Sequence, residues 1–149
     1  MRLVVQRVSH GEVRVLNEVV GAIGSGLLAL VGFGASDVES TVQPLIEKMV
    51  HLRIFSDERG RFQHSLLDLK GELLLVPQFT LYADTSRGRR PGFDGALAPE
   101  KALQLFERAV ECARGFPLTK VATGKFGAHM QVSLQNDGPV TILLDSEQA

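Results

Sequence analysis

The chain has 149 residues, a formal net charge of −1, 44% hydrophobic residues and 22% charged residues. These values are typical of one soluble globular domain with a sizeable core, and the near-neutral charge argues against a protein that coats nucleic acid. The single cysteine, Cys112, excludes an internal disulfide and a cysteine metal site and fits a reducing cytoplasm. The longest apolar stretch, 27–33, is too short to cross a bilayer, so we expect a soluble cytoplasmic protein without a membrane partner.

The first third of the chain predicts β-strands. Its segments are β-branched or alternate apolar and polar residues, and turn residues separate them. Gly11 interrupts the first segment. The glycines of GAIGSG (21–26) lack the lysine and hydroxyl residue of a phosphate-binding loop, so they are interpreted as turn glycines. The expected strands are 2–8, 12–16, 19–23 and 27–33.

A helix is expected next. Apolar residues recur at helical spacing over 38–50, and Ser36 with Glu39 has the spacing of a capping box. Pro44 inside this stripe predicts that the helix either begins late or kinks. The segment that follows, 52–62, has the pattern of a strand, a tight turn and a returning strand.

The stretch 72–93 carries the most unusual chemistry. An apolar run, 73–76, predicts a buried strand, and Pro77 cannot donate to a strand ladder, so pairing should loosen there. Gln78 and Thr80 follow at the expected sheet edge. This order suggests a site for an anionic substrate with a polar reactive end, but this stretch alone favours the alternative, an ordinary strand followed by a solvated loop. The basic residues of the loop are Arg87, Arg89 and Arg90.

The last third predicts a second helix and three strands. Pro99 suits the first turn of a helix, an apolar stripe follows it, and Gly115 is a natural stop. The Asn-Asp-Gly-Pro segment at 136–139 predicts a hairpin turn between the final two strands. A cis bond at Pro139 is not assumed from this pattern, since only about 5–6% of X–Pro bonds are cis. The expected strands are 118–123, 130–134 and 140–144.

The order of the expected elements is strands, helix, strands, helix, strands. No internal repeat, low-complexity tract or linker interrupts it. We therefore expect a single α+β domain over residues 1–149, with largely antiparallel sheets and two helices packed on one side.

Residue types that commonly perform catalysis do not form a recognisable motif in this chain. The four histidines have no metal-ligand spacing, and no Gly-x-Ser-x-Gly elbow, dinucleotide fingerprint or zinc pattern is present. We therefore expect no metal and no cofactor. Thr80 is a candidate nucleophile by placement only, because no base is visibly paired with it. Composition and spacing alone lead to an α+β domain with a candidate site near Gln78.

Six segments of the chain together resemble the D-aminoacyl-tRNA deacylases. Their spacing matches this family over nearly the whole length. The QFTL strand end and the NDGPVT turn are highly specific together, whereas either alone is a weak signal. The segments are QRV (6–8), LRIF (52–55), PQFTL (77–81), ADTSRGRRPGF (83–93), TGKFGAHMQVSL (123–134) and NDGPVT (136–141).

The resemblance implies an enzyme that hydrolyses the ester between a D-amino acid and the 3′-terminal adenosine of tRNA, and that also removes mischarged glycine. It implies a homodimer with the partial-barrel fold of this family, no cofactor, and tRNA rather than DNA as the partner. It further implies that Gly138–Pro139 is cis and reaches into the partner's pocket, where its carbonyl oxygens exclude L side chains. Such a rigid steric filter still admits glycine.

The same resemblance implies roles for individual residues. Catalysis falls to Gln78, Phe79 and Thr80. An aminoacyl ester is already activated and a 2′-hydroxyl lies beside it, so the protein need only orient the ester and stabilise the oxyanion through main-chain N–H groups, here those of Phe79 and Thr80. Thr80 is then a positioning residue first and a nucleophile second. Arg7 orients the Gly138–Pro139 turn, unless it is an ordinary outward-facing strand charge. The implied substrate-binding residues are Phe126, Gly127, Ala128 and Met130, and the implied tRNA-binding residues are Arg87, Arg89, Arg90 and Lys125.

Pro77 departs from the family pattern, which usually has serine there. A related branch with a Pro-Gln pattern pairs it with a trans Gly-Pro bond and a relaxed filter that accepts L-alanyl-tRNA. Because this chain retains NDGPVT and Phe79, we favour the cis, D-selective alternative. A non-catalytic tRNA-binding module is the third alternative, but such a copy should have lost Gln78 or Gly138–Pro139.

Overall fold

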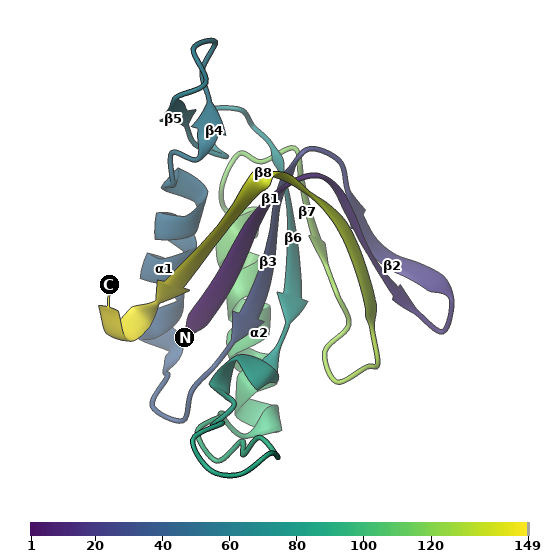
Figure 1. Ribbon diagram of the computed structural model, residues 1–149, viewed down its shortest axis with the longest axis vertical. Coiled ribbons are helices and arrows are strands. Elements are labelled where there is room, and N and C mark those ends of the chain that lie inside the picture. Colours follow the sequence, from purple (N-terminus) through teal and green to yellow (C-terminus); the bar gives the residue numbers. More distant parts are fainter. Residues whose placement is uncertain (149) are drawn as a thin grey trace.

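The computed structural model describes residues 1–148, and it confirms an α+β domain with both helices on one face of a strongly bent sheet (Figure 1). Short 3-10 turns, η1 and η2, complete the structure. The elements in chain order are β1 (Arg2–Val15), β2 (Glu18–Ile23), β3 (Gly26–Gly32), α1 (Glu39–His51), β4 (Phe55–Ser56), β5 (Phe62–His64), β6 (Glu72–Pro77), η1 (Phe79–Tyr82), α2 (Pro99–Arg114), β7 (Lys120–Thr123), β8 (Gln131–Asp145) and η2 (Ser146–Gln148).

Strand β1 is the centre of the main sheet. It pairs antiparallel with β3 through its first half, with β2 through its second half, and with β8 along nearly its whole length. Strand β6 pairs parallel with β3 on one side and with β7 on the other. These parallel pairings arise because α1 and α2 carry the chain back between the strands. The arch formed by the long strands gives the partial barrel seen in Figure 1.

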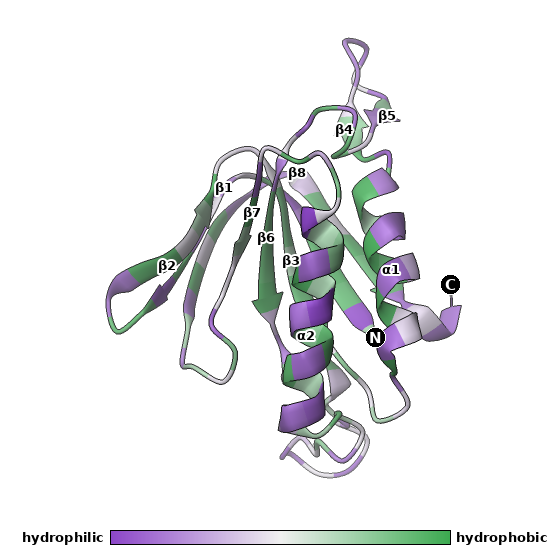
Figure 2. Ribbon diagram, turned by 180° about the vertical axis from the view of Figure 1, so that it is seen from behind, coloured by the Kyte–Doolittle hydropathy of each residue, from purple (hydrophilic) through white to green (hydrophobic). Residues whose placement is uncertain are grey.

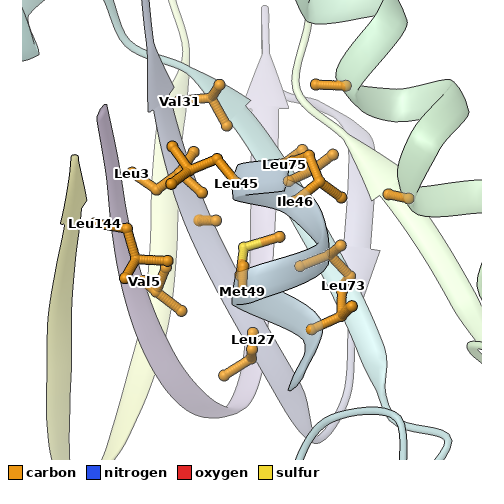
Figure 3. Close-up of a cluster of buried hydrophobic side chains, with 14 of the residues drawn as sticks. Leu3, Val5, Leu27, Val31, Leu45, Ile46, Met49, Leu73, Leu75 and Leu144 are labelled. Atoms are coloured by element: carbon orange, nitrogen blue, oxygen red, sulfur yellow. The ribbon is translucent and has the colours of Figure 1, made fainter. Parts of the chain in front are cut away.

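Helix α1 packs its apolar stripe against the main sheet. Figure 3 shows Leu45, Ile46 and Met49 of α1 pointing toward side chains of β1, β3 and β6, among them Leu73 and Leu75. All five are fully buried, and burial of one such side chain contributes roughly 1.5–3 kcal/mol. Figure 2 shows hydrophilic residues on the outer sides of both helices. A smaller cluster fills the other face of the sheet, with Val8, Val13, Ile23, Leu28, Leu74 and Val76.

The start of α1 differs from the sequence prediction. The helix begins at Glu39, ahead of Pro44, so the late start is wrong. The expected capping box of Ser36 with Glu39 is also wrong. The Asp37 N–H donates to the Gly34 carbonyl at 3.0 Å, and this tight turn places Ser36 before the helix, so Ser36 is not its N-cap residue.

Two strands run further than expected. Strand β1 continues through Gly11, where the absence of a side chain allows close packing, since a Cβ atom there would lie 3.2 Å from Leu28 Cδ1. Strand β8 is one strand where a hairpin was expected. The expected turn between β4 and β5 is confirmed. Within residues 1–148, no helix combines the length and apolar character needed to span a membrane.

Candidate active site

Strand β6 delivers a polar segment to the edge of the main sheet. Its last residue, Pro77, lies opposite Val31 of β3. Because proline has no N–H, the regular ladder loosens there, although the Gln78 N–H still donates to the Val31 carbonyl at 2.8 Å. The chain then turns directly into η1. Gln78 therefore lies at the end of the strand, and Phe79 and Thr80 lie at the start of the 3-10 turn.

The side chains at this rim contact one another. Gln78 Nε2 donates a short hydrogen bond to Thr80 Oγ1, which fixes the amide and the hydroxyl relative to each other. The ring of Phe79 is 58% exposed and meets the Phe93 ring edge-on, with centroids 5.0 Å apart. The N–H groups of Phe79 and Thr80 begin the turn and have no acceptor within it. The rim thus presents an amide, a hydroxyl, an aromatic ring and two main-chain donors.

Arg2 anchors η1 to the start of β1 and to the end of β8, which pair with each other. Its Nη1 donates to the Leu81 carbonyl at 3.0 Å, and its guanidinium lies 4.4 Å from the centroid of the Tyr82 ring. Its Nε donates to Asp145 at 2.9 Å, and this hydrogen bond raises the pKa of Arg2. Burial, reinforced by the Asp37 carboxylate, raises the pKa of Tyr82, so its hydroxyl stays protonated and donates to Asp37 at 3.4 Å. The start of β1 and the end of β8 thereby hold the turn in place.

A pocket of about 600 Å³ opens beside this rim. Its walls are largely apolar with a few polar groups, as is typical of small-molecule sites. Thr80 does not line the pocket but borders it through its hydrogen bond with Gln78. Within residues 1–148, no group of three or more histidine, cysteine or acidic side chains is arranged to hold a metal ion. The pocket brings together six of the site residues predicted from the sequence: Gln78, Phe79, Phe126, Gly127, Ala128 and Met130.

Sequence reasoning missed several lining residues. Phe33 follows β3 and Ala102 lies in the first turns of α2, and both have the pattern of ordinary core positions. Phe93 lies in one of the quoted family segments, but its role emerges only from its packing on Phe79. His129 adjoins Met130 in sequence and, like Phe93, lies in a quoted family segment, and these were the signals available for it.

The Asn-Asp-Gly-Pro segment is a loop that protrudes from the middle of β8. The predicted hairpin is wrong because both halves of β8 pair with β1 in the same direction. The register places Asn136 opposite Val8 and Thr141 opposite Gln6, so residues 137–140 lie opposite a single residue of β1. The extra residues are extruded from the ladder as in an enlarged β-bulge.

This loop is held at both ends. The Asn136 side chain accepts the Val140 N–H at 2.9 Å and so closes the base of the loop. Arg7 Nε donates to the Asp137 carbonyl at 2.8 Å. The Gly138–Pro139 bond is cis, and both of its residues are exposed. The Gly138–Pro139 segment is therefore exposed main chain that hydrogen bonds hold in place.

Arg7 also ties the loop to the chain before β4. Its Nη1 donates to the Ile54 carbonyl at 2.7 Å, and its guanidinium lies 5.8 Å from the centroid of the Phe62 ring. The Arg7 side chain is only 12% exposed, so it is not an outward-facing strand charge. Gly138 has φ +142°, and a Cβ atom there would lie 3.0 Å from Arg7 Nη2. Both the backbone conformation and the space therefore require glycine at this position.

The loop and the pocket lie apart in one chain. In β3, Leu27 pairs with Arg7, whereas Val31, four residues further along, lines the pocket. That separation corresponds to roughly 13 Å of strand. Neither Gly138 nor Pro139 lines the pocket of its own chain. The structure therefore brings Gln78 and Phe79 together with the 126–130 segment, but it does not bring them together with the Gly-Pro loop.

Basic residues lie on two loops near the pocket. One loop is closed by Asp84 and Gly92, which exchange backbone hydrogen bonds of 2.8 and 2.9 Å. The other begins with Lys125, directly before the pocket-lining segment. Within the described part of the chain, the basic side chains of these loops form no ion pair. The exposed residues are Arg87, Arg89, Arg90 and Lys125.

Comparisons with known proteins find similarity along nearly the whole chain. A model of the family "D-Tyr-tRNA(Tyr) deacylase" matches residues 4–145. The D-aminoacyl-tRNA deacylase of Roseiflexus sp. (strain RS-1) is 58% identical over 146 residues, which cover 98% of this chain and 94% of that protein. The enzyme of the same name from Thermosipho melanesiensis is 51% identical over 148 residues, 99% of each chain. A solved structure of the c-Myc DNA Unwinding Element Binding Protein superposes with a TM-score of 0.91 at 39% identity, covering 97% of this chain and 98% of that one.

These matches define a class first, that of hydrolases acting on ester bonds. Within that class, the chain belongs to the D-Tyr-tRNA(Tyr) deacylase family, because the family model and the relatives cover nearly its full length. It is accordingly an enzyme with D-aminoacyl-tRNA deacylase activity, and aminoacyl-tRNA is its substrate class.

Proposed function

We propose that the enzyme hydrolyses D-aminoacyl-tRNA and mischarged glycyl-tRNA as a cytoplasmic homodimer, in which each subunit supplies the chiral filter for the other. The separation between the exposed Gly138–Pro139 loop and the pocket beside Gln78 carries this proposal. A tethered loop that lies away from its own pocket is available to the pocket of a second copy. In a two-fold symmetric dimer, the same contact forms twice.

The pocket is proposed to take the 3′-terminal adenosine, with the ester at the rim beside Gln78. The apolar walls suit the purine base, and the polar groups at the rim suit the ester and the ribose. The main-chain N–H groups of Phe79 and Thr80 are the proposed donors to the oxyanion that forms when water attacks the ester carbonyl. The terminal 2′-hydroxyl of the substrate assists that water, which is why the site needs no side-chain nucleophile.

The Gly138–Pro139 loop is proposed to discriminate between D- and L-aminoacyl-tRNA by steric exclusion. Its tethers to Asn136 and Arg7 support this role, because a loop held at both ends does not yield to an incoming side chain. An L side chain meets this main chain, whereas a D side chain points away from it. Glycine has no side chain to reject, so glycyl-tRNA is also hydrolysed.

The exposed arginines of the 84–92 loop and Lys125 are proposed to contact phosphates of the tRNA acceptor stem. Their lack of ion pairs within residues 1–148 supports this assignment, because phosphate binding then breaks no existing interaction. Contacts of this kind position the RNA without reading its sequence, and they weaken as salt rises.

The position of Pro77 favours testing one alternative, a relaxed selectivity for the amino acid on the tRNA. Pro77 lines the pocket, and a Pro-Gln pattern implies a relaxed filter that accepts L-alanyl-tRNA. The test compares single-turnover hydrolysis of D-tyrosyl-, glycyl- and L-alanyl-tRNA by the full-length enzyme. We expect the first two substrates to be cleaved and L-alanyl-tRNA to be cleaved at least a hundredfold more slowly. Rapid cleavage of L-alanyl-tRNA would contradict the D-selective filter.

A further inference from the structure

Gly124 directly follows β7 and lies behind the wall of the pocket. It is buried, and its N–H donates to the Leu75 carbonyl at 2.8 Å, which continues the pairing of β6 with β7. Its backbone is not in the left-handed region that favours glycine. A glycine is therefore not needed here for backbone conformation, and the backbone is not free to move away from its neighbours.

The space beside Gly124 is filled by groups that line the pocket. A Cβ atom at this position would lie 2.8 Å from Met130 Sδ, 3.3 Å from Pro77 Cδ and 3.5 Å from Val76 Cγ1. The first of these distances is too short for real atoms, so the thioether would have to leave its place. Met130, Pro77 and Val76 all line the pocket. The Met130 sulfur thus occupies space that a side chain at position 124 would need.

A main-chain donor holds the same sulfur atom. The Lys125 N–H donates to Met130 Sδ at 3.3 Å. A thioether is a weak acceptor, and methionine is among the most adaptable side chains in a protein interior. A hydrogen bond to the sulfur together with close packing therefore selects one conformation of a side chain that otherwise has several.

We propose that Gly124 and the Lys125 amide form a seat for the Met130 thioether, and that this seat positions the wall of the pocket that receives the terminal adenosine. Gly124 acts through Met130 and is a positioning residue. The inference rests on the proposed function for the identity of the ligand. Because the nucleoside is bound equally in the ground state and the transition state, the seat affects KM rather than kcat.

The test substitutes Gly124→Ala and measures steady-state hydrolysis of D-tyrosyl-tRNA. It also measures binding of a nonhydrolysable probe, 3′-(D-alanylamino)-3′-deoxyadenosine, by calorimetry. We expect KM and the probe Kd to rise about tenfold, the scale on which one methylene group matters in an apolar pocket, with kcat changed less than about twofold. Gly24→Ala is the matched control, because a Cβ atom there meets only a Glu72 carboxylate oxygen at 3.9 Å. Unchanged KM and Kd in Gly124→Ala would overturn the inference.

A coupling measurement separates the seat from a general packing defect. Met130→Ala removes the sulfur, so adding Gly124→Ala to it should cost little further affinity for the probe. Full additivity of the two substitutions would overturn the inference. Met130→Leu keeps Gly124 and a side chain of similar volume but removes the sulfur acceptor, so its Kd for the probe should also rise. This variant keeps the test decisive should Gly124→Ala not fold. A wild-type enzyme that neither binds the probe nor cleaves D-tyrosyl-tRNA would instead contradict the proposed function itself.

Discussion

The Thr80 hydroxyl accepts its hydrogen bond from the Gln78 amide. Among the described residues, no imidazole or carboxylate hydrogen-bonds to this hydroxyl, so none of them is placed to activate it as a nucleophile. We expect Thr80→Ala to lower kcat by about ten- to a hundredfold through lost positioning, while measurable turnover remains. Rapid-quench analysis of wild-type enzyme with D-tyrosyl-tRNA checks this expectation. A trapped acyl-enzyme, together with complete loss of turnover in the variant, would identify Thr80 as the nucleophile.

Arg7 holds two carbonyl groups that lie far apart in the sequence, those of Asp137 and Ile54. Lysine retains the charge but has a single ammonium group, which does not reproduce this forked geometry. We expect Arg7→Lys to reduce the preference for D-tyrosyl- over L-tyrosyl-tRNA at least tenfold, with kcat for the D substrate little changed. Arg14→Lys, on the same strand, is the matched control because, within residues 1–148, the Arg14 side chain hydrogen-bonds to Glu12 and Asn17 and to neither of the carbonyls that Arg7 holds. Equal selectivity in Arg7→Lys and wild type would remove Arg7 from the filter.

At the scale of elements, η1 depends on a cation from β1. Arg2 and Arg14 have nearly equal side-chain exposure, 42% and 43%, and each is paired with a carboxylate, but only Arg2 contacts η1. We expect Arg2→Ala to lower the free energy of unfolding by about 1 kcal/mol, the scale of a partly exposed ion pair with a cation–π contact. It should also lower kcat several-fold because η1 loosens. Urea unfolding and single-turnover kinetics, with Arg14→Ala as control, measure both effects. A kcat loss of the same size in Arg14→Ala would contradict the anchoring role.

Element by element, the sequence was most informative where apolar patterns were long. The periodicity predicted both helices and the buried strands, because burial on one or two faces leaves a direct pattern in the residues. It failed at the 136–139 segment. Asn-Asp-Gly-Pro is ordinary turn chemistry, and nothing local distinguishes a reversing hairpin from a loop extruded within one strand. Pairing with β1, a contact between distant parts of the chain, decides the outcome.

For the whole molecule, the pocket was only partly predictable. Its rim follows β6 directly in the sequence, so Gln78 and Phe79 could be predicted as site residues from their position after an apolar strand and from the family resemblance. Phe33 and Ala102 come from other layers of the fold and meet the rim only after folding. Their side chains have the composition of ordinary core residues, and only the packed structure reveals that they border a cavity.

Acid should weaken the whole fold through carboxylates that accept hydrogen bonds in loops. Such bonds favour the ionised form, so the folded pKa lies below the unfolded value near 3.9, and the stabilisation is lost as pH falls through the folded pKa. We expect the free energy of unfolding to be flat from about pH 7 to 5 and to fall below about pH 4. Urea titrations at stepped pH measure this, and Asp57→Asn should flatten the decline. An unfolding free energy independent of pH down to 2 would contradict it. Three loop carboxylates with lowered pKa, and their main donors, are Asp57 with Arg61, Asp68 with Ser65 and Asp84 with Ser86.

The central claim is that a loop from one subunit guards the pocket of the other. The most direct measurement mixes two kinds of subunit and follows L-alanyl-tRNA hydrolysis per intact pocket. Pro139→Ala subunits keep their pocket but have an altered loop, and Gln78→Ala subunits keep their loop but have a disabled pocket. We expect Pro139→Ala dimers to hydrolyse L-alanyl-tRNA, and an excess of Gln78→Ala subunits to suppress that reaction while D-tyrosyl-tRNA hydrolysis continues. L-alanyl-tRNA hydrolysis that is unaffected by the added subunits would show that the filter acts within one chain.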